Sequence, residues 1–184
     1  MKTLVILMEE QSAKALLEGL LPRILPGNTR VIPLVFQGKQ DLESNITRKL
    51  QAWQDDKASF LILRDQDNAT CKAVKDGLVR RCQASGKRRW KVRVACRELE
   101  AWLLGDLAAV EAGLNLHGVA QMQGKKKFRE PDNTQRPSDV LREVTGGAYQ
   151  KVGGCRAIGP YLSLNKNASP SYRVFVDAVK ELTR

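Results

Sequence analysis

The stretch SFLILRDQDN, residues 59–68, joins a short apolar run directly to a pair of acids. Residues 59–63 have the length and composition of a strand that is buried on both faces of a sheet. Arg64 and the acids Asp65 and Asp67 follow at the carboxyl end of that strand. In an extended segment, side chains two residues apart point to the same side, so both carboxylates can reach one site. This stretch therefore predicts a buried strand that delivers two acids to one edge of a sheet.

Three further strands are predicted around this one, with helices between them. The other strands are expected over 3–8, 30–36 and 90–96, and the helices over 12–25, 41–53, 71–84 and 99–113. Pro33 removes a backbone donor from the second strand, which favours an edge position for that strand or a bulge. Asp41 is a candidate cap of the second helix. This alternation predicts an α/β fold, a mostly parallel four-stranded sheet with helices on both faces.

The second part of the chain begins with a polar, basic and proline-containing stretch, which is expected to form a long loop. A short helix is expected over 137–144, and an amphipathic helix over 170–183. We therefore expect one domain over residues 1–184. Its α/β core is expected over 1–113, followed by the basic loop and a C-terminal helical extension over 114–184.

The chain is strongly basic, with a formal net charge of +11. An excess of Lys and Arg favours a polyanionic partner, because binding releases counterions. Two basic clusters also contain an aromatic residue, an arrangement that suits backbone binding combined with base stacking. The residues expected to contact nucleic acid, DNA or RNA, are Arg88 and Arg89 around Trp90, and Lys126, Lys127 and Arg129 around Phe128. Neither cluster lies on an obvious amphipathic helix, so an anionic membrane is a less favoured partner.

The composition disfavours several other kinds of site. The four cysteines lack the close pairs of a zinc site, and we expect free, mostly buried thiols in a reducing compartment. The single histidine, His117, lies in a loop-like stretch without a partner for a catalytic relay. Residues 1–8 contain an apolar run that is too short to span a membrane, and it leads into acids instead of a cleavage site. We expect a cytoplasmic protein.

Acids follow two more of the predicted strands. Glu9 and Glu10 follow the first strand, and Glu98 and Glu100 follow the fourth. Because the carboxyl ends of parallel strands meet at one edge of a sheet, these acids are expected to lie near Asp65 and Asp67. Clustered carboxylates repel one another, and a hard divalent cation such as Mg²⁺ resolves that repulsion. The predicted metal ligands are Asp65, Asp67 and one of Glu9 and Glu10.

Ordinary structural roles compete with this interpretation. Asp67 or Asn68 is also suited to cap the helix that follows. One of Glu9 and Glu10 is suited to the start of the first helix, where an acid complements the helix dipole. Glu98 is interpreted as a solvated surface acid.

These segments resemble the Toprim fold of topoisomerases, primases and the overcoming-lysogenization-defect (OLD) nucleases. That family has a Glu after its first strand, usually followed by Gly, and a D-x-D after its third. Glu9 matches the first motif, and Asp65 and Asp67 match the second. Glu10 stands at the position of the usual Gly, and Ala13 at that of a second acid. The resemblance implies a Toprim-like fold in which Glu9, Asp65 and Asp67 are catalytic and bind Mg²⁺ (or Mn²⁺).

The chain is also similar to a bacterial family of unknown function, DUF4276, which is classed with the Toprim-like proteins. The similar segments are RDQDN at 64–68, RELEAWLLGD at 97–106 and SPSY at 169–172. The second of these segments implies that Glu100 is a catalytic acid, either a further metal ligand or a general base. It also implies Asp106 as a further candidate.

We therefore expect a Mg²⁺-dependent nuclease or phosphodiesterase acting on nucleic acid, in which the metal activates water and neutralises phosphate. Related Toprim nucleases often work with an ATPase, sometimes in phage defence. No G-x-x-x-x-G-K-[ST] motif occurs here, so an ATPase partner would be a separate chain. The alternative is a non-catalytic module that binds nucleic acid or protein, which the missing Gly at position 10 favours. A phosphoesterase acting on a nucleotide is disfavoured by the broad basic charge.

Overall fold

Four parallel strands form one sheet in the computed structural model, which describes all residues from 1 to 184. Their order across the sheet is β2-β1-β3-β4. The strands are β1 (Lys2–Met8), β2 (Thr29–Val35), β3 (Ser59–Asp65) and β4 (Trp90–Ala95). Strands β1, β2 and β4 begin and end within one residue of their predicted bounds, and β3 extends two residues beyond its predicted end. The apolar runs of β1 and β3 are almost fully buried, as expected of central strands in a parallel sheet.

Strand β2 lies at one edge of the sheet and pairs only with β1. It contains Pro33, which lies opposite Ile6. Because proline has no backbone N–H, an edge strand tolerates it while a central strand does not. The edge position predicted from Pro33 is therefore confirmed.

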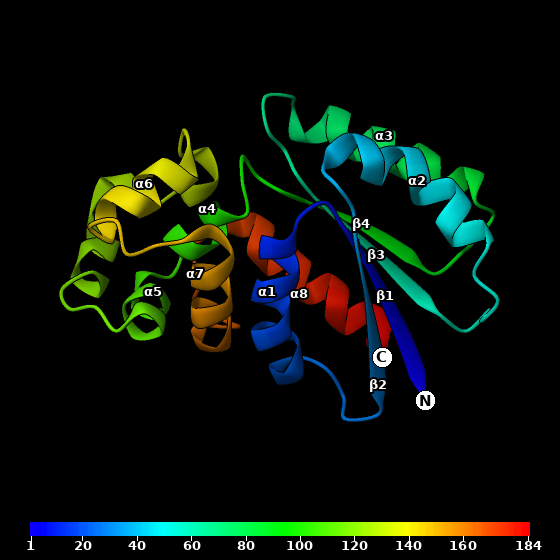
Figure 1. Cartoon of the computed structure of the whole chain (residues 1–184), viewed down its shortest axis with the longest axis horizontal. Helices are drawn as coiled ribbons and strands as arrows, with labels where there is room; N and C mark the ends of the chain where they lie inside the picture. The colour runs from blue at the N-terminus through cyan, green and yellow to red at the C-terminus, as the bar shows by residue number, and fades with distance from the viewer.

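Helices cover both faces of the sheet (Figure 1). Helices α2 (Lys39–Gln51) and α3 (Cys71–Ala84) lie on one face, and α1 (Gln11–Leu20) and α8 (Pro170–Thr183) lie on the other. Alternate residues of β1 supply the two cores, Val5 facing α2 and α3, and Ile6 facing α1 and α8. The predicted α/β fold with helices on both faces is confirmed.

The remaining helices lie beyond α1, on the left of Figure 1. They are α4 (Glu100–Leu104), α5 (Leu107–Leu114), α6 (Pro137–Val144) and α7 (Lys151–Ile158). Helix α7, which the sequence did not predict, packs against α1. At Gly159, just after α7, a Cβ atom would lie 2.4 Å from the backbone oxygen of Leu16. Only glycine permits this close approach, which brings the end of α7 beside the middle of α1.

The expectation of a long loop up to residue 138 was wrong. This stretch contains three short 3-10 turns, Ala120–Gly124, Lys126–Phe128 and Pro131–Asn133. Phe128 and Val119 are buried in the larger core, and these apolar anchors hold the basic stretch against the rest of the chain. Periodicity could not reveal such short turns, because each is shorter than the pattern needed to recognise a helix.

The single helix predicted over 99–113 is also wrong, because the chain breaks between Leu104 and Leu107 to form α4 and α5. Asp106 causes the break, since its extended backbone places it as the N-cap of α5. Its Oδ1 accepts a hydrogen bond from the N–H of Ala109 at 3.1 Å, and its Oδ2 accepts one from Ser163 at 2.6 Å. Asp106 therefore has a structural role, in contrast to the site role implied from sequence.

Replacing Asp106 with alanine should lower the free energy of unfolding by about 1–2 kcal/mol, because the N-cap of α5 and the bond to Ser163 are lost together. Urea unfolding monitored by circular dichroism measures this change. Asp106→Asn, which retains one acceptor oxygen, should lose less. Equal stability of Asp106→Ala and wild type would contradict this role.

None of the helices combines the length and apolar character that a membrane-spanning segment requires.

Candidate functional site

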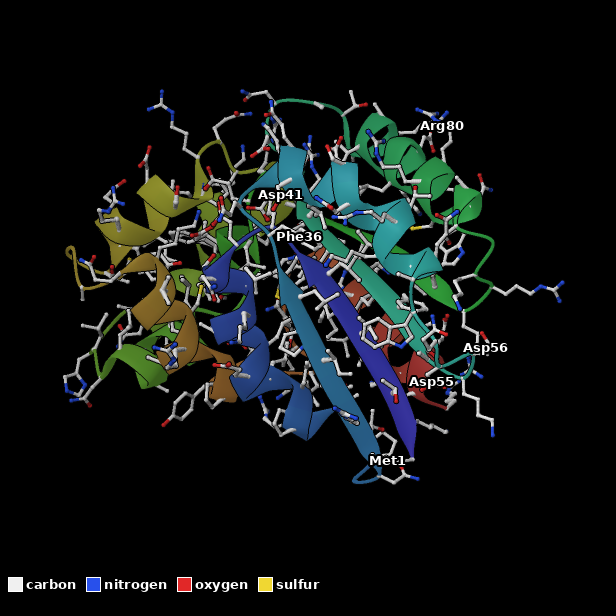
Figure 2. All side chains as sticks on the ribbon, turned by 45° about the vertical axis from the view of Figure 1, so that its right-hand side comes forward. Met1, Phe36, Asp41, Asp55, Asp56 and Arg80 are labelled. Carbon is white, nitrogen blue, oxygen red and sulfur yellow. The ribbon has the colours of Figure 1, made fainter.

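Four carboxylates meet where β1 and β3 end and α4 begins, and we call Glu9, Glu10, Asp65 and Glu100 the acid cluster. Glu9 and Glu100 are only 8% and 1% exposed. The backbone N–H of Asp65 donates to Oε1 of Glu9 at 3.4 Å, which links the ends of the two central strands. Phe36 and Asp41, which follow β2, lie at this same edge of the sheet (Figure 2). The convergence expected from strand direction is therefore present for these four acids.

Burial and mutual repulsion raise the pKa values of three acids of the cluster, Glu9, Asp65 and Glu100. Burial, with the nearby Asp67 carboxylate, raises the pKa of Glu9 from 4.5 to about 7. Burial raises the pKa of Asp65 well above its usual range, and repulsion from Glu9 and Glu100 adds to the effect. Burial also raises the pKa of Glu100. Without a cation, part of the cluster must remain protonated at neutral pH.

Two carboxylate oxygens in the cluster lack any partner. Oε2 of Glu9 and Oε2 of Glu100 are both buried and accept no hydrogen bond. Such orphaned acceptors are rare in folded proteins and call for an explanation. A cavity of about 10 Å³, lined by Glu9, Glu10 and Asp65 among others, has room for one water-sized species.

The donor chemistry of the acid cluster fits a hard divalent cation, because Mg²⁺ and Mn²⁺ prefer oxygen ligands. In their present positions, however, no three Asp, Glu, Cys or His side chains form a group that could hold a metal ion. Binding would therefore require the carboxylates to turn toward one another. The orphaned oxygens of Glu9 and Glu100 are free to do so.

Two residues that the sequence did not indicate complete the surroundings of the cluster. The hydroxyl of Tyr149 donates to Oε1 of Glu100 at 2.9 Å, and Lys151, the first residue of α7, forms an ion pair with Glu10. Burial lowers the pKa of Lys151, but Glu10 and Glu100 raise it by more, and the net shift is upward. These residues lie about 50 positions after Glu100 in the chain, so no local motif could have associated them with the acids.

Asp67, a predicted metal ligand, is directed mainly toward cations. Its Oδ2 lies 2.9 Å from Nζ of Lys39 and 3.8 Å from the guanidinium of Arg64. Asp67 remains near enough to Glu9 to affect its pKa, but its carboxylate is already paired. Neither Asp67 nor Asn68 caps α3, because the cap is Thr70, whose hydroxyl accepts from the N–H of Ala73 at 3.2 Å.

The interpretation of Glu98 as a solvated surface acid was wrong. Its side chain is half-buried, and its Oε2 accepts a hydrogen bond from the N–H of Ser138 at 2.8 Å. Ser138 lies in the first turn of α6, where the helix dipole favours a negative charge. Glu98 therefore anchors the start of α6 to the loop that follows β4.

The two predicted basic clusters lie apart from one another. Arg88 and Arg89 precede β4, and they line a hollow with Asp56, which marks the amino edge of the sheet in Figure 2. The acid cluster lies at the opposite edge, so these two arginines lie away from a phosphate that is held there. In the second cluster the ring of Phe128 is 2% exposed, so it is not available for base stacking. Lys126, Lys127 and Arg129 are exposed and remain predicted nucleic-acid contacts.

The cysteines are free, but only two of the four are buried, namely Cys82 and Cys155. Cys71 and Cys96 are half-buried, with their sulfur atoms 3.1 Å apart. The expectation of mostly buried thiols therefore holds for half of them.

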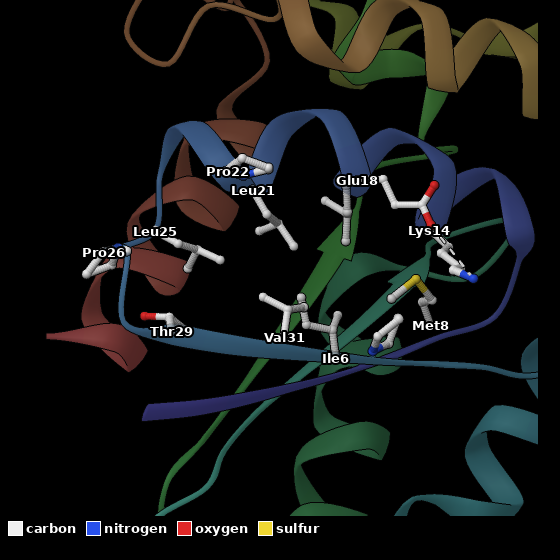
Figure 3. A pocket seen from close by; sticks show the side chains of 13 residues that line it. Ile6, Met8, Lys14, Glu18, Leu21, Pro22, Leu25, Pro26, Thr29 and Val31 are labelled. Carbon is white, nitrogen blue, oxygen red and sulfur yellow. Dashed lines mark ion pairs between the residues drawn. The ribbon is translucent and has the colours of Figure 1, made fainter. Parts of the chain in front are cut away.

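A much larger cavity than the one beside Glu9 lies away from the acid cluster (Figure 3). It has a volume of about 510 Å³ and lies between α1 and strands β1 and β2. Its walls are largely apolar, with Ile6, Met8 and Val31 among them, and its charged groups, Lys14 and Glu18, pair with each other at 3.7 Å. This cavity lacks the groups that hydrolysis of a phosphodiester requires, so size alone does not identify the candidate site.

The raised pKa of Glu9 predicts that metal-free protein loses stability as the pH rises. Folding favours the protonated carboxyl, so this contribution is complete below pH 4.5 and disappears as the pH rises through about 7. The loss should be about 3 kcal/mol. Urea unfolding in EDTA at pH 5 and pH 8 measures it. Glu9→Gln, which cannot ionise, should lose correspondingly less stability between pH 5 and pH 8. An identical loss in both proteins would show that Glu9 is not the group responsible.

A family model described as Domain of unknown function (DUF4276) matches residues 8–180, nearly the whole chain. The matched region includes Glu9, Asp65 and Glu100 of the acid cluster, together with Lys151. No curated protein and no solved structure gives a match to this sequence. The chain belongs to the DUF4276 family.

Proposed function

We propose that the protein is a metal-dependent phosphodiester hydrolase that acts on nucleic acid, with the acid cluster as its centre. The observation that carries the proposal is the pair of buried carboxylate oxygens, on Glu9 and Glu100, that have no partner beside the half-buried Asp65. A cation is the partner we propose for these oxygens, because it would offset the burial and the repulsion that raise the pKa values of Glu9 and Asp65.

Glu9, Asp65 and Glu100 are the residues that would hold Mg²⁺ or Mn²⁺. When bound, the metal supplies Lewis acidity toward a phosphoryl oxygen and lowers the pKa of a water ligand. Asp67 has a secondary role in this proposal, since its carboxylate is engaged by Lys39. It remains close enough to add negative charge to the site.

The other residues of the chain orient these ligands. The hydroxyl of Tyr149 holds one oxygen of Glu100 and leaves the other free. Lys151 and the hydroxyl of Ser12 both bind Oε2 of Glu10, and so draw that carboxylate away from its neighbours. Such outer contacts fix the direction of a ligand and are a regular part of metal sites.

The resemblance to Toprim proteins supports the same proposal. The two matching motifs are Glu9, after β1, and Asp65 with Asp67, at the end of β3. They lie close together because β1 pairs with β3. Within this proposal the chain is a Toprim-like nuclease that works with a separate ATPase chain, in phage defence or DNA processing, inside the cytoplasm.

A cleavage assay tests the proposed activity. Wild-type protein is incubated with single-stranded DNA, duplex DNA and RNA in the presence of Mg²⁺, Mn²⁺ or EDTA. We expect cleavage of at least one substrate that depends on the added metal. Cleavage that is equal in EDTA would contradict a metal mechanism, and no cleavage of any substrate would favour the second candidate below.

The second candidate is a non-catalytic module that binds nucleic acid or protein. It is favoured by the position of Lys151, whose ammonium group already neutralises part of the acid cluster. In that case the cluster is a buried network that fixes α7 against the sheet. The module would bind the same nucleic acids without cutting them, and its affinity would not respond to metal.

A further inference from the structure

A polar cleft lies beside the acid cluster, at the same edge of the sheet. It has a volume of about 320 Å³, and Pro137 is the only nonpolar residue that lines it. Its walls come from the start of α2, the loops that follow β3 and β4, and the start of α6. Its charged residues are Lys39, Asp67, Arg97, Glu98 and Arg136.

The acids of the polar cleft are already engaged, while the side chain of one of its cations has no partner and that of another has only an exposed one. Asp67 pairs with Lys39 at 2.9 Å, and Glu98 accepts from the backbone of α6 at 2.8 Å. Arg97 is half-buried, and only its backbone N–H and carbonyl take part in hydrogen bonds, so its guanidinium has no partner. Arg136 is exposed, and its nearest carboxylate, on Asp139, is 3.7 Å away. The guanidinium of Arg97 is therefore free to bind an anion, and that of Arg136, held only by an exposed ion pair with Asp139, can turn to the same anion.

The backbone holds these charged residues in an unusual conformation. The chain has four non-glycine residues with positive φ, and three of them line the polar cleft: Asp67 at 56°, Arg97 at 62° and Arg136 at 49°. This conformation is uncommon outside glycine and persists only where the surroundings impose it, often at functional sites. Here the N–H of Asp67 donates to the carbonyl of Arg97 at 3.0 Å, and the N–H of Arg97 donates to Oε1 of Gln66 at 3.0 Å.

We infer that the polar cleft binds a backbone phosphate of the nucleic acid next to the one at the acid cluster, through Arg97 and Arg136. The inference rests on the proposed function. A planar guanidinium matches a phosphate through two parallel hydrogen bonds, and the cleft supplies two such groups. No aromatic or large apolar side chain is present to hold a base or a sugar. The ligand is therefore the backbone of a polynucleotide, as opposed to a free nucleotide.

Position also favours this cleft over the clusters expected from sequence. Asp67, in its wall, is two residues from Asp65, so a strand seated at the acid cluster would extend directly into it. Arg88 and Arg89 line a different hollow, at the other edge of the sheet. The basic residues that hold the substrate would then be Arg97 and Arg136.

Fluorescence anisotropy with labelled DNA and RNA 20-mers in EDTA tests this inference without any need for cleavage. Arg97→Ala and Arg136→Ala should each raise the Kd by about tenfold, since hydrogen bonds to charged groups are strong. For a duplex, the slope of log K against log salt should fall by about one for each arginine. The double variant Arg88→Ala/Arg89→Ala removes two charges at the other edge, twice the loss in either cleft variant, and should still bind with less than a twofold change.

Three results would overturn the inference: wild type that does not bind any 20-mer, cleft variants that bind like wild type, or a mononucleotide that competes as well as a 20-mer. Thermal unfolding checks that each variant is folded. Arg97→Lys retains the positive charge but lacks the paired N–H donors of a guanidinium, so it should recover only part of the affinity. If binding depends on Arg97 but the protein never cleaves nucleic acid, the proposed activity is refuted and the role of the cleft stands. If the protein cleaves nucleic acid but the Arg97 and Arg136 variants bind as tightly as wild type, the role of the cleft is refuted and the proposed activity stands.

Discussion

Asp65→Asn should abolish metal-dependent cleavage, with a rate loss of about 1,000-fold or more, because the substitution removes a charged ligand from the centre of the acid cluster. The same change should raise the stability of the metal-free fold at pH 8, since Asp65 is a carboxyl whose ionisation burial opposes. The measurements are initial cleavage rates and urea unfolding in EDTA. A lost activity combined with a raised stability distinguishes a functional role from misfolding.

Asp56→Asn is the matched control for this substitution. Asp56 undergoes the same chemical change, but its side chain is 93% exposed and lies at the amino edge of the sheet. Its activity and stability should both remain close to those of wild type. Full activity of Asp65→Asn would refute the assignment of Asp65, whatever its stability.

Trp102→Ala should lower the free energy of unfolding by about 3–5 kcal/mol, the range for removal of a large buried aromatic side chain. Trp102 is fully buried in α4, and its ring lies 4.9 Å from that of Phe175 and 5.6 Å from that of Tyr172 in α8. Its indole N–H also donates to the hydroxyl of Ser171 at 2.9 Å. Urea unfolding measures the loss, and the m-value shows whether the transition remains cooperative.

Tyr161→Ala serves as the comparison, because Tyr161 is an aromatic residue that is 55% exposed. We expect it to change stability by less than about 0.5 kcal/mol. Trp102→Phe retains much of the side-chain volume, so its loss of stability should lie between those of Trp102→Ala and Tyr161→Ala. A loss below about 1 kcal/mol for Trp102→Ala would contradict the view that Trp102 joins the sheet-facing helix α8 to the helices after β4.

The central strands β1 and β3 were predictable because each is a short apolar run buried on both faces of the sheet, and β4 because its residues alternate. Pro33 added the edge position of β2 through its missing donor. The helices after β4 were harder to predict. Asp106 breaks a continuous apolar pattern by capping α5, and α7 contains Gly153 and Gly154, whose weak helix propensity hides it.

The carboxyl-edge argument brought Glu9, Glu10, Asp65 and Glu100 together correctly, because strand direction alone determines where those residues lie. The same argument should have separated Arg88 and Arg89 from the acids, since residues that precede a parallel strand lie at the opposite edge. Lys151 and Tyr149 could not be predicted. Their approach depends on how α7 packs against α1, which is a long-range contact without a local signal.

Isothermal titration of the metal-free protein with Mn²⁺ tests the central claim, that the acid cluster holds a divalent cation, most directly. The account predicts saturable binding with proton release near pH 6, because part of the cluster is protonated beforehand. It also predicts that Asp65→Asn loses this binding and that Asp56→Asn retains it. Wild-type protein that takes up no Mn²⁺, or Asp65→Asn that binds it as tightly as wild type does, would contradict the claim.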